Sequence, residues 1–278
     1  MTEYMVSSTE HKRVLILTDL HFCDKAWHGL SCLKRMELLQ KVLQKEAAEN
    51  PFDVLLCLGD YSLDFWAWES KGSYLCTPSV SNTENFVQQI VPKFPVHPYM
   101  IPGNHEQYGH LKWKEITGYP RQYNVVYGKC VFLMCDTFGG NLEPTEHSDG
   151  TYSGLDFAFL KETIEKYPNH ELILCMHDLM PELETNEVKE LVKTSGRFCC
   201  GFAGHTHRSD TVLLGKEWGY LPLFYCGDFS YTADCEQNAY PNWGFRQVDL
   251  SQGIRTKYCP CLQKNDWDFE IHAAIQKK

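Results

Sequence analysis

Short hydrophobic runs recur along the chain, and five of them end in a polar cluster. The runs VLILT, VLLCL, HPYMIP, LILCM and FCCGFA are typical of buried strands in a covered sheet, because most are rich in Val, Ile and Leu. The clusters that follow them are Asp19-Leu20-His21, Gly59-Asp60, Gly103-Asn104-His105-Glu106, His177 and Gly204-His205-Thr206-His207. Since functional groups of open α/β sheets gather at the carboxyl ends of strands, we expect these clusters to meet at one sheet edge.

The same patterning predicts the remaining elements. We predict helices over Ser31–Glu49, Asn82–Val91, Leu155–Tyr167 and Glu187–Lys193. We predict strands over Val14–Thr18, Val54–Leu58, Val96–Ile101, Lys129–Asp136, Leu172–Met176 and Phe198–Ala203, followed by a meander over Thr211–Leu214, Leu221–Cys226 and Phe245–Leu250. This order predicts an α/β fold in a single domain over residues 1–278, with a tail after about residue 250.

Composition narrows the class of protein. The chain has 278 residues, of which 43% are hydrophobic, so it is long enough to bury a sizeable core. Its formal net charge of -10 argues against a nucleic-acid backbone or an anionic membrane surface as the main partner. A small anionic substrate is still compatible with that charge, because bound metal ions would invert the local field.

Cysteine usage points to a reducing compartment. The chain has 13 Cys, several of them inside apolar runs, and no secretory segment precedes the first predicted strand. We therefore expect a cytoplasmic protein with reduced thiols, and we expect Cys259 and Cys261 to be surface thiols. No run approaches the ~20 apolar residues that a bilayer span needs.

In order and spacing class, the five clusters resemble the signature of the calcineurin-like metallophosphoesterase superfamily. The match runs from Asp19 to His207, and the strand-rich remainder to about Asp249 also fits. The resemblance implies a four-layer α/β/β/α sandwich of two mixed sheets flanked by helices. It also implies an enzyme, a phosphoric ester hydrolase with a dinuclear metal centre.

The resemblance assigns seven metal ligands: Asp19, His21, Asp60, Asn104, His177, His205 and His207. Asp60 would bridge the two ions. Burying so many imidazoles without a ligand would be costly, which supports this interpretation. The donor set has no Cys and mixes carboxylate, amide oxygen and imidazole, so it suits two divalent or mixed-valence ions of Mn, Fe, Zn or Co.

The resemblance also implies a mechanism, in which a hydroxide bridging both metals attacks phosphorus in line. His105 is expected to be catalytic and not a ligand, either stabilising the phosphoryl charge or protonating the leaving oxygen. Glu106 or Asp64 would orient His105 or a neighbouring ligand. Asp64 lies four residues after Asp60, one more than in many relatives, so surface placement of Asp64 is an equally open interpretation.

Aromatic residues after Asp60 are candidates for substrate contact. The segment YSLDFWAWESKGSY either forms a wall of the site or packs against outer helices. The candidate substrate-binding residues are Asn104, Tyr61, Trp66, Tyr108 and Arg208. We favour a phosphodiesterase acting on a small-molecule or nucleotide-like substrate. A phosphomonoesterase, a nuclease and a non-catalytic scaffold on the same fold are the alternatives.

The expected partner is thus a small phosphate ester, with neither nucleic acid nor membrane involved. The oligomeric state is left open, and a monomer is compatible with the sequence.

Overall fold

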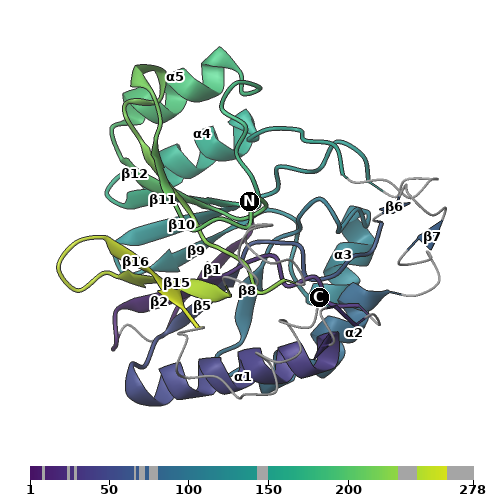
Figure 1. The fold of residues 1–278 in the computed structure, drawn as a ribbon. Coiled ribbons are helices and arrows are strands. Elements are labelled where there is room, and N and C mark those ends of the chain that lie inside the picture. The colour runs from purple at the N-terminus through teal and green to yellow at the C-terminus, as the bar shows by residue number, and fades with distance from the viewer. Residues whose placement is uncertain are drawn as a thin grey trace.

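Two mixed β-sheets pack face to face, with helices on both outer faces (Figure 1). The computed structural model describes residues 1–7, 10–23, 26–27, 30–65, 67–68, 73–74, 81–142, 150–230 and 243–261. In Figure 1, α4 (Phe157–Lys166) and α5 (Asn186–Ser195) lie above the first sheet. The helices α1 (Cys32–Glu49) and α2 (Asn82–Gln89) lie below the second. This is the four-layer α/β/β/α fold that the family resemblance implies.

The first sheet has seven strands in the order β1-β9-β10-β11-β12-β14-β13. Their bounds are β1 Glu3–Met5, β9 Tyr123–Tyr127, β10 Cys130–Cys135, β11 Glu171–Met176, β12 Phe198–Ala203, β14 Pro222–Tyr225 and β13 Thr211–Leu213. The central strands β10, β11, β12 and β14 are parallel, whereas β9 pairs antiparallel with β10 and β13 antiparallel with β14.

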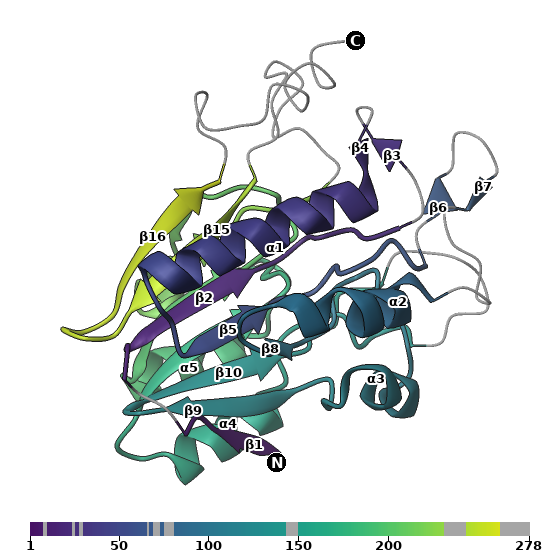
Figure 2. The ribbon, with the colours of Figure 1, turned by 90° about the horizontal axis from the view of Figure 1, so that it is seen from below.

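The second sheet has five strands in the order β16-β15-β2-β5-β8. Their bounds are β16 Arg255–Pro260, β15 Gly244–Asp249, β2 Arg13–Leu17, β5 Val54–Cys57 and β8 Pro98–Met100. The strands β2, β5 and β8 are parallel and carry α1 and α2 along one face (Figure 2). The strands β15 and β16 form an antiparallel hairpin at the sheet edge.

Smaller elements complete the chain. They are β3 Ala26–Trp27, β4 Leu30–Ser31, β6 Ala67–Trp68, β7 Ser73–Tyr74, the 3-10 helices η2 Val91–Lys93 and η3 Lys216–Trp218, and α3 His110–Thr117. Among the helices in the described ranges, none has both the length and the apolar composition that crossing a bilayer requires.

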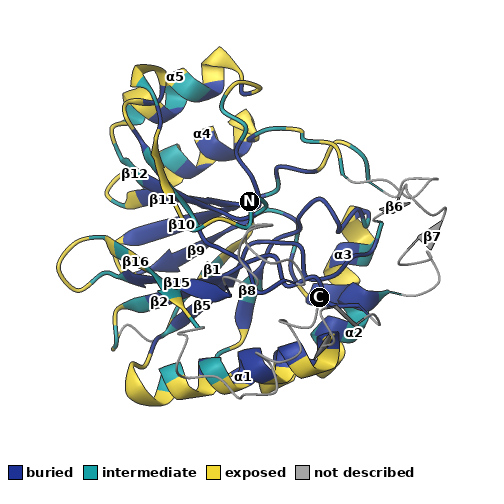
Figure 3. Cartoon of the chain, viewed as in Figure 1, coloured by how far each residue is buried: buried dark blue, intermediate teal, exposed yellow. Residues whose placement is uncertain are grey.

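The alternation of side chains along β10 shows how the layers are held together. Phe132 and Met134 belong to the main core, which includes residues of both sheets, whereas Val131 and Leu133 belong to the cluster that also contains α4 and α5 residues. Successive strand residues point to opposite faces, so an unbroken apolar run fills both layers. Figure 3 shows the result, with buried strands inside and exposed residues on the outer helix surfaces.

Every predicted helix and strand is present, with ends shifted by at most two residues or so. The predicted meander is wrong, because β15 leaves the first sheet and pairs with β2 in the second. The predicted tail after about residue 250 is also wrong, because β16 continues this sheet. As an edge strand, β16 is largely exposed or half-buried, and it therefore lacks a hydrophobic signal.

Two further points concern the C-terminal region. Cys259 and Cys261 are partly buried against the main core, so their expected placement as surface thiols is wrong. The residues after Cys261 lie outside the described ranges, and the single domain over residues 1–278 stays a prediction.

Candidate metal centre

The five polar clusters lie in loops that leave the carboxyl ends of five strands. Asp19 and His21 follow β2, Asp60 follows β5, Asn104 and His105 follow β8, His177 follows β11, and His205 and His207 follow β12. The first three loops come from one sheet and the last two from the other. The facing sheets therefore bring together residues up to 188 positions apart, from Asp19 to His207.

Asp60 lies at the middle of the assembled group. Its Oδ2 is 3.2 Å from Nε2 of His21 and 3.2 Å from Nε2 of His177. Nε2 of His105 is 3.6 Å from the same oxygen. The backbone N–H of His105 donates to the other oxygen, Oδ1, at 3.1 Å. One carboxylate thus touches residues from three other loops or strands.

Three more pairs of ligand atoms flank Asp60. On one side, Asn104 Oδ1 is 2.9 Å from His177 Nε2 and 3.0 Å from His205 Nδ1. On the other side, Asp19 Oδ1 is 3.3 Å from His207 Nε2. The structure therefore brings together all seven predicted ligands and His105.

Three groups of these side chains have ligand atoms that all lie within 4.8 Å of one another. They are Asp19, His21 and His207; His21, Asp60 and His105; and Asp60, His177 and His205. Each group could hold a metal ion. The first and the third consist of predicted ligands alone, whereas the second also includes His105.

The backbone at this edge is strained. Eight non-glycine residues in the described ranges have positive φ, and five of them are predicted ligands: Asp19, His21, Asp60, His205 and His207. Left-handed conformations of such residues cost free energy and concentrate at functional sites. The strain is compatible with loops shaped to aim their side chains inward.

Two glycines allow the loops of β5 and β8 to approach closely. A Cβ on Gly59, whose φ is +95°, would lie 2.6 Å from Gly103 N. A Cβ on Gly103 would lie 2.2 Å from Asp60 Oδ1. Glycine at both positions is therefore required for Asp60 to occupy its place.

Glu106 fixes the loop that carries Asp60. Its Oε2 accepts hydrogen bonds from the N–H groups of Asp60 at 2.8 Å and Gly103 at 2.9 Å. Its Oε1 accepts from Tyr61 N at 3.0 Å and Ser62 N at 3.3 Å. Burial, with the nearby charge of Asp60, raises the pKa of Glu106 to about 8. Glu106 thus orients a ligand loop through its backbone, in agreement with the predicted orienting role.

Asp64 lies at the start of α2 and not on the surface. It is buried, with Oδ1 accepting from Asn82 N and Oδ2 from Thr83 N, at the N-terminus of α2. Tyr108 donates its hydroxyl to the same Oδ2 at 2.5 Å. Surface placement is therefore wrong, and Asp64 accepts hydrogen bonds from the first N–H groups of α2.

The imidazoles are oriented by partners on their outer side. His177 Nδ1 is 2.8 Å from the carbonyl oxygen of Leu58, and His21 Nδ1 is 2.5 Å from Ser230 Oγ. A donor hydrogen bond from Nδ1 leaves the Nε2 lone pair facing Asp60, which is how metal-binding histidines are commonly held. Ser230 was not predicted, because it lies 209 residues from His21.

Burial and nearby carboxylates act in opposite directions on the pKa values of the site histidines. Burial alone would lower the pKa of His177, yet Asp60 and Asp19 raise it to about 10. Burial opposes protonation of His207 as well, but its bond to Asp19 raises the pKa to about 9. Burial lowers the pKa of His21 to about 4. Buried carboxylates therefore attract positive charge here, whether a proton or a metal cation.

The residues fit a divalent cation. Asp19 is fully buried, and its Oδ1 lies 3.3 Å from Nε2 of His207, another predicted ligand. Burying a carboxylate is costly unless a positive charge compensates it. Two carboxylates, one amide oxygen and several imidazoles form a donor set suited to transition-metal ions.

The structure does not gather the candidate substrate-binding residues in the way that it gathers the predicted ligands. The prediction that Tyr61 binds substrate is wrong, because its side chain is fully buried. Its hydroxyl donates to the carbonyl oxygens of Cys57 and Ile101, each at 2.7 Å. It is a core residue and cannot face a substrate. Trp66 lies outside the described residues. Arg208 is exposed and lies 3.7 Å from Asp210.

Tyr108 is half-buried, and its ring contacts Phe65 edge-on with centroids 5.0 Å apart. Substrate contact by Asn104, Tyr108 and Arg208 stays a prediction.

An aromatic wall beside the histidines was missed by the sequence analysis. The ring of Phe138 lies 5.6 Å from the ring of His177 and 5.7 Å from that of His205. Tyr152 contacts Phe138 from the other side, with ring centroids 5.7 Å apart. The available signal was that the apolar run of β10 also ends in a carboxylate, Asp136, two residues before Phe138.

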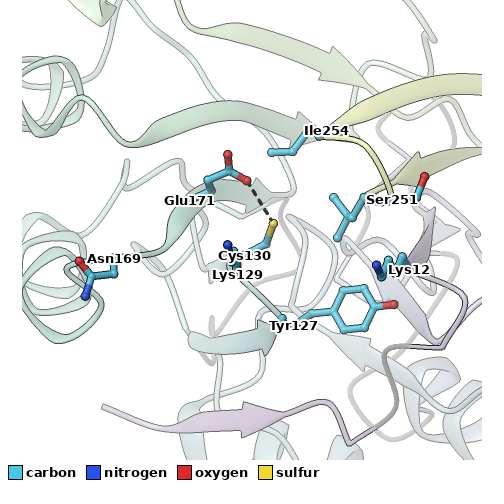
Figure 4. A pocket seen from close by; sticks show the side chains of 11 residues that line it. Lys12, Tyr127, Lys129, Cys130, Asn169, Glu171, Ser251 and Ile254 are labelled. Carbon is cyan, nitrogen blue, oxygen red and sulfur yellow. Dashed lines mark hydrogen bonds between the residues drawn. The ribbon is translucent and has the colours of Figure 1, made fainter.

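A hollow of about 660 Å³ lies elsewhere, where β10 and β11 begin (Figure 4). Its lining includes Lys12, Tyr127, Lys129, Glu171 and Ile254, and none of the predicted site residues. The candidate metal centre is at the opposite ends of these strands.

Comparison with known families agrees with this geometry. The model of the calcineurin-like phosphoesterase family matches residues 12–209, which is more than half of the chain. The chain therefore belongs to the calcineurin-like phosphoesterase family. It is accordingly a metal-dependent phosphoric ester hydrolase, of a family that typically binds divalent metals.

Among solved structures, one match is the crystal structure of a novel phosphatase from Mycoplasma pneumoniae. It is 12% identical, with a TM-score of 0.43, and the match covers 89% of this chain and 92% of that chain. A comparison with curated protein sequences finds no match.

Proposed function

We propose that the protein is a phosphodiesterase that uses two divalent cations to hydrolyse a small-molecule or nucleotide-like substrate. One observation carries the proposal. Asp60 Oδ2 is equally close to His21 and His177, at 3.2 Å from each Nε2, so one oxygen is shared by two ligand groups. A shared carboxylate is what a pair of ions about 3.5–4 Å apart requires.

The two ligand groups divide around Asp60. Asp19, His21 and His207 would hold one ion, and Asn104, His177 and His205 the other, with Asp60 common to both. Bound cations of this kind neutralise phosphoryl oxygens and lower the pKa of water enough to provide a nucleophile near neutral pH. Mn, Fe, Zn and Co all suit the donors.

His105 has a separate role in the proposal. Its backbone N–H is fixed by Asp60 Oδ1, and its ring reaches the inner edge of the site, with Nε2 3.6 Å from Asp60 Oδ2. From there it would donate a hydrogen bond to a phosphoryl oxygen or a proton to the leaving oxygen. Asn104 would hold the substrate as well as an ion.

The charges near the site favour a diester. A monoester carries an extra negative charge and needs further positive groups. Among the described arginines near these loops, Arg121 is engaged by Asp136, Arg35 donates to the carbonyl oxygens of Leu20 and His21, and Arg208 lies beside Asp210. The net charge of -10 further favours a small substrate over nucleic acid, and we place the enzyme in the cytoplasm on the strength of its cysteine content.

Hydrolysis of bis-para-nitrophenyl phosphate and para-nitrophenyl phosphate, each with added Mn²⁺ and again after chelation, tests the proposal. We expect faster turnover of the diester and loss of activity on chelation. A strong preference for the monoester would overturn the diester assignment. Cleavage of DNA would favour a nuclease, and a metal-free chain without activity would favour a scaffold.

A further inference from the structure

A buried arginine, which the proposed mechanism does not use, connects two walls of the site. Arg121 lies between α3 and β9, and its side chain is 1% exposed. Its Nη1 donates to the carbonyl oxygens of Glu106 at 2.9 Å and Tyr108 at 2.8 Å. These carbonyls belong to the loop that carries Asn104 and His105. One guanidinium nitrogen therefore fixes the loop just beyond the two residues.

The other side of the guanidinium binds Asp136, at the end of β10. Arg121 Nε donates to Asp136 Oδ2 at 2.6 Å, and Nη2 donates to Oδ1 at 3.2 Å. Asp136 Oδ1 also accepts from Phe138 N at 3.1 Å. The ring of Phe138 packs against His177 and His205. Asp136 thus couples the guanidinium to the aromatic wall beside two candidate ligands.

We propose that Arg121 and Asp136 form a positioning pair, which sets the placement of His105 and Asn104 relative to the wall at Phe138. This inference rests on the proposed function, because the proposed function gives His105 and Asn104 their roles at the site. A buried ion pair is weak evidence for stability, because desolvation offsets its attraction. Here all the bonds of the guanidinium converge on two segments that border the site.

Only arginine can make these contacts together. Its planar fork presents two parallel donors to a carboxylate while Nη1 points elsewhere, whereas the ammonium of lysine is a single point charge. Lys at position 121 would keep the charge beside Asp136 but could not hold both carbonyls and both carboxylate oxygens. Small displacements of groups that act on the transition state cost far more in rate than in binding.

The test compares Arg121→Lys with Arg197→Lys. Arg197 also donates to two carbonyls, those of Tyr167 and Ile164, but these lie at the end of α4, away from the ligands. For each variant and the wild type, we would measure kcat and KM for bis-para-nitrophenyl phosphate, bound Mn²⁺ and Tm. We expect Arg121→Lys to lower kcat about 10- to 100-fold with KM changed less than about threefold.

Arg197→Lys should lower Tm without changing kcat. A kcat of Arg121→Lys within about twofold of the Arg197→Lys value would overturn the proposal. If Arg121→Lys does not fold, Asp136→Asn is measured in the same way, with the same expected and contradicting results. Failure of the proposed function is distinct from these outcomes, because it would appear as an inactive wild-type protein.

Discussion

The two ends of the parallel strands differ in the burial of their charged residues, in backbone conformation and in electrostatics. At the carboxyl ends, predicted ligands are largely buried, five of them adopt positive φ, and carboxylates shift the pKa of histidines. At the opposite ends, a roomy hollow is lined mostly by exposed residues such as Lys12, Lys129 and Glu171. A hollow of about 660 Å³ is by itself no evidence of a functional site.

The candidate metal centre is distinguished from the hollow by its buried charged and titratable groups. Burying carboxylates and imidazoles costs free energy, which a fold recovers when a ligand compensates the charge. Lysines on the surface around a hollow stay hydrated, so their placement has no comparable free-energy cost. By themselves they do not indicate a binding site. Substitutions at the two ends of the strands should therefore have very different effects on activity.

The largest contrast should come from the carboxylates. Asp60→Asn removes the shared ligand, and we expect kcat to fall at least about 10³-fold, because metal assistance is worth several kcal/mol and each ~1.4 kcal/mol is a factor of ten. Asp249→Asn, in β15 at the other end, should change kcat less than about twofold. Steady-state kinetics with Mn²⁺ measures both. Substantial activity in Asp60→Asn would show that no bridging ligand is needed.

Next in size should be the histidine that is not a ligand. His105→Gln should lower kcat about 10²- to 10³-fold, the usual cost of losing a general acid or a charge-stabilising donor. The Mn²⁺ content should stay at the wild-type level. His97→Gln, at an exposed histidine, is the control. Loss of metal in His105→Gln would instead make His105 a ligand.

A pair of glycines gives a contrast in backbone packing. Gly103→Ala would push a Cβ against Asp60 Oδ1, so we expect a loss of about 10- to 100-fold in kcat. Gly128→Ala, in the turn between β9 and β10, meets no atom within 4 Å and only strains a φ of +61°. It should reduce the free energy of unfolding by about 1–2 kcal/mol with kcat unchanged. Equal effects on kcat would contradict the proposed role of Gly103.

The smallest effect should come from the hollow itself. Lys12→Ala combined with Lys129→Ala should leave kcat and KM within about twofold of wild type, as for surface substitutions remote from a site. A marked rise in KM for the diester would mean that substrate reaches this end of the strands, and the contrast between the two ends would fail.

The family resemblance named the candidate ligands, and their convergence could be predicted from sequence because each lies within four residues of a strand end. An apolar run marks the strand, and the next residues must lie at the sheet edge, so local pattern and site coincide. The edge strand β16 could not be predicted, since it is never fully buried. Tyr61 was misassigned because its neighbour Asp60 faces the site while its own ring packs into the core.

The supporting residues are invisible for a different reason. Ser230 reaches His21, and Arg121 reaches Glu106 and Asp136, only after the chain has folded. Nothing near them in the sequence distinguishes them from other serines and arginines. A contact between distant segments has no local pattern, so the support of a site is harder to predict than its ligands.

Crystals of the protein grown with Mn²⁺ and measured at the manganese absorption edge would show whether two cations share Asp60. We predict two anomalous peaks about 3.5–4 Å apart, one on each side of Asp60. A single peak, or peaks away from Asp60, would contradict this prediction.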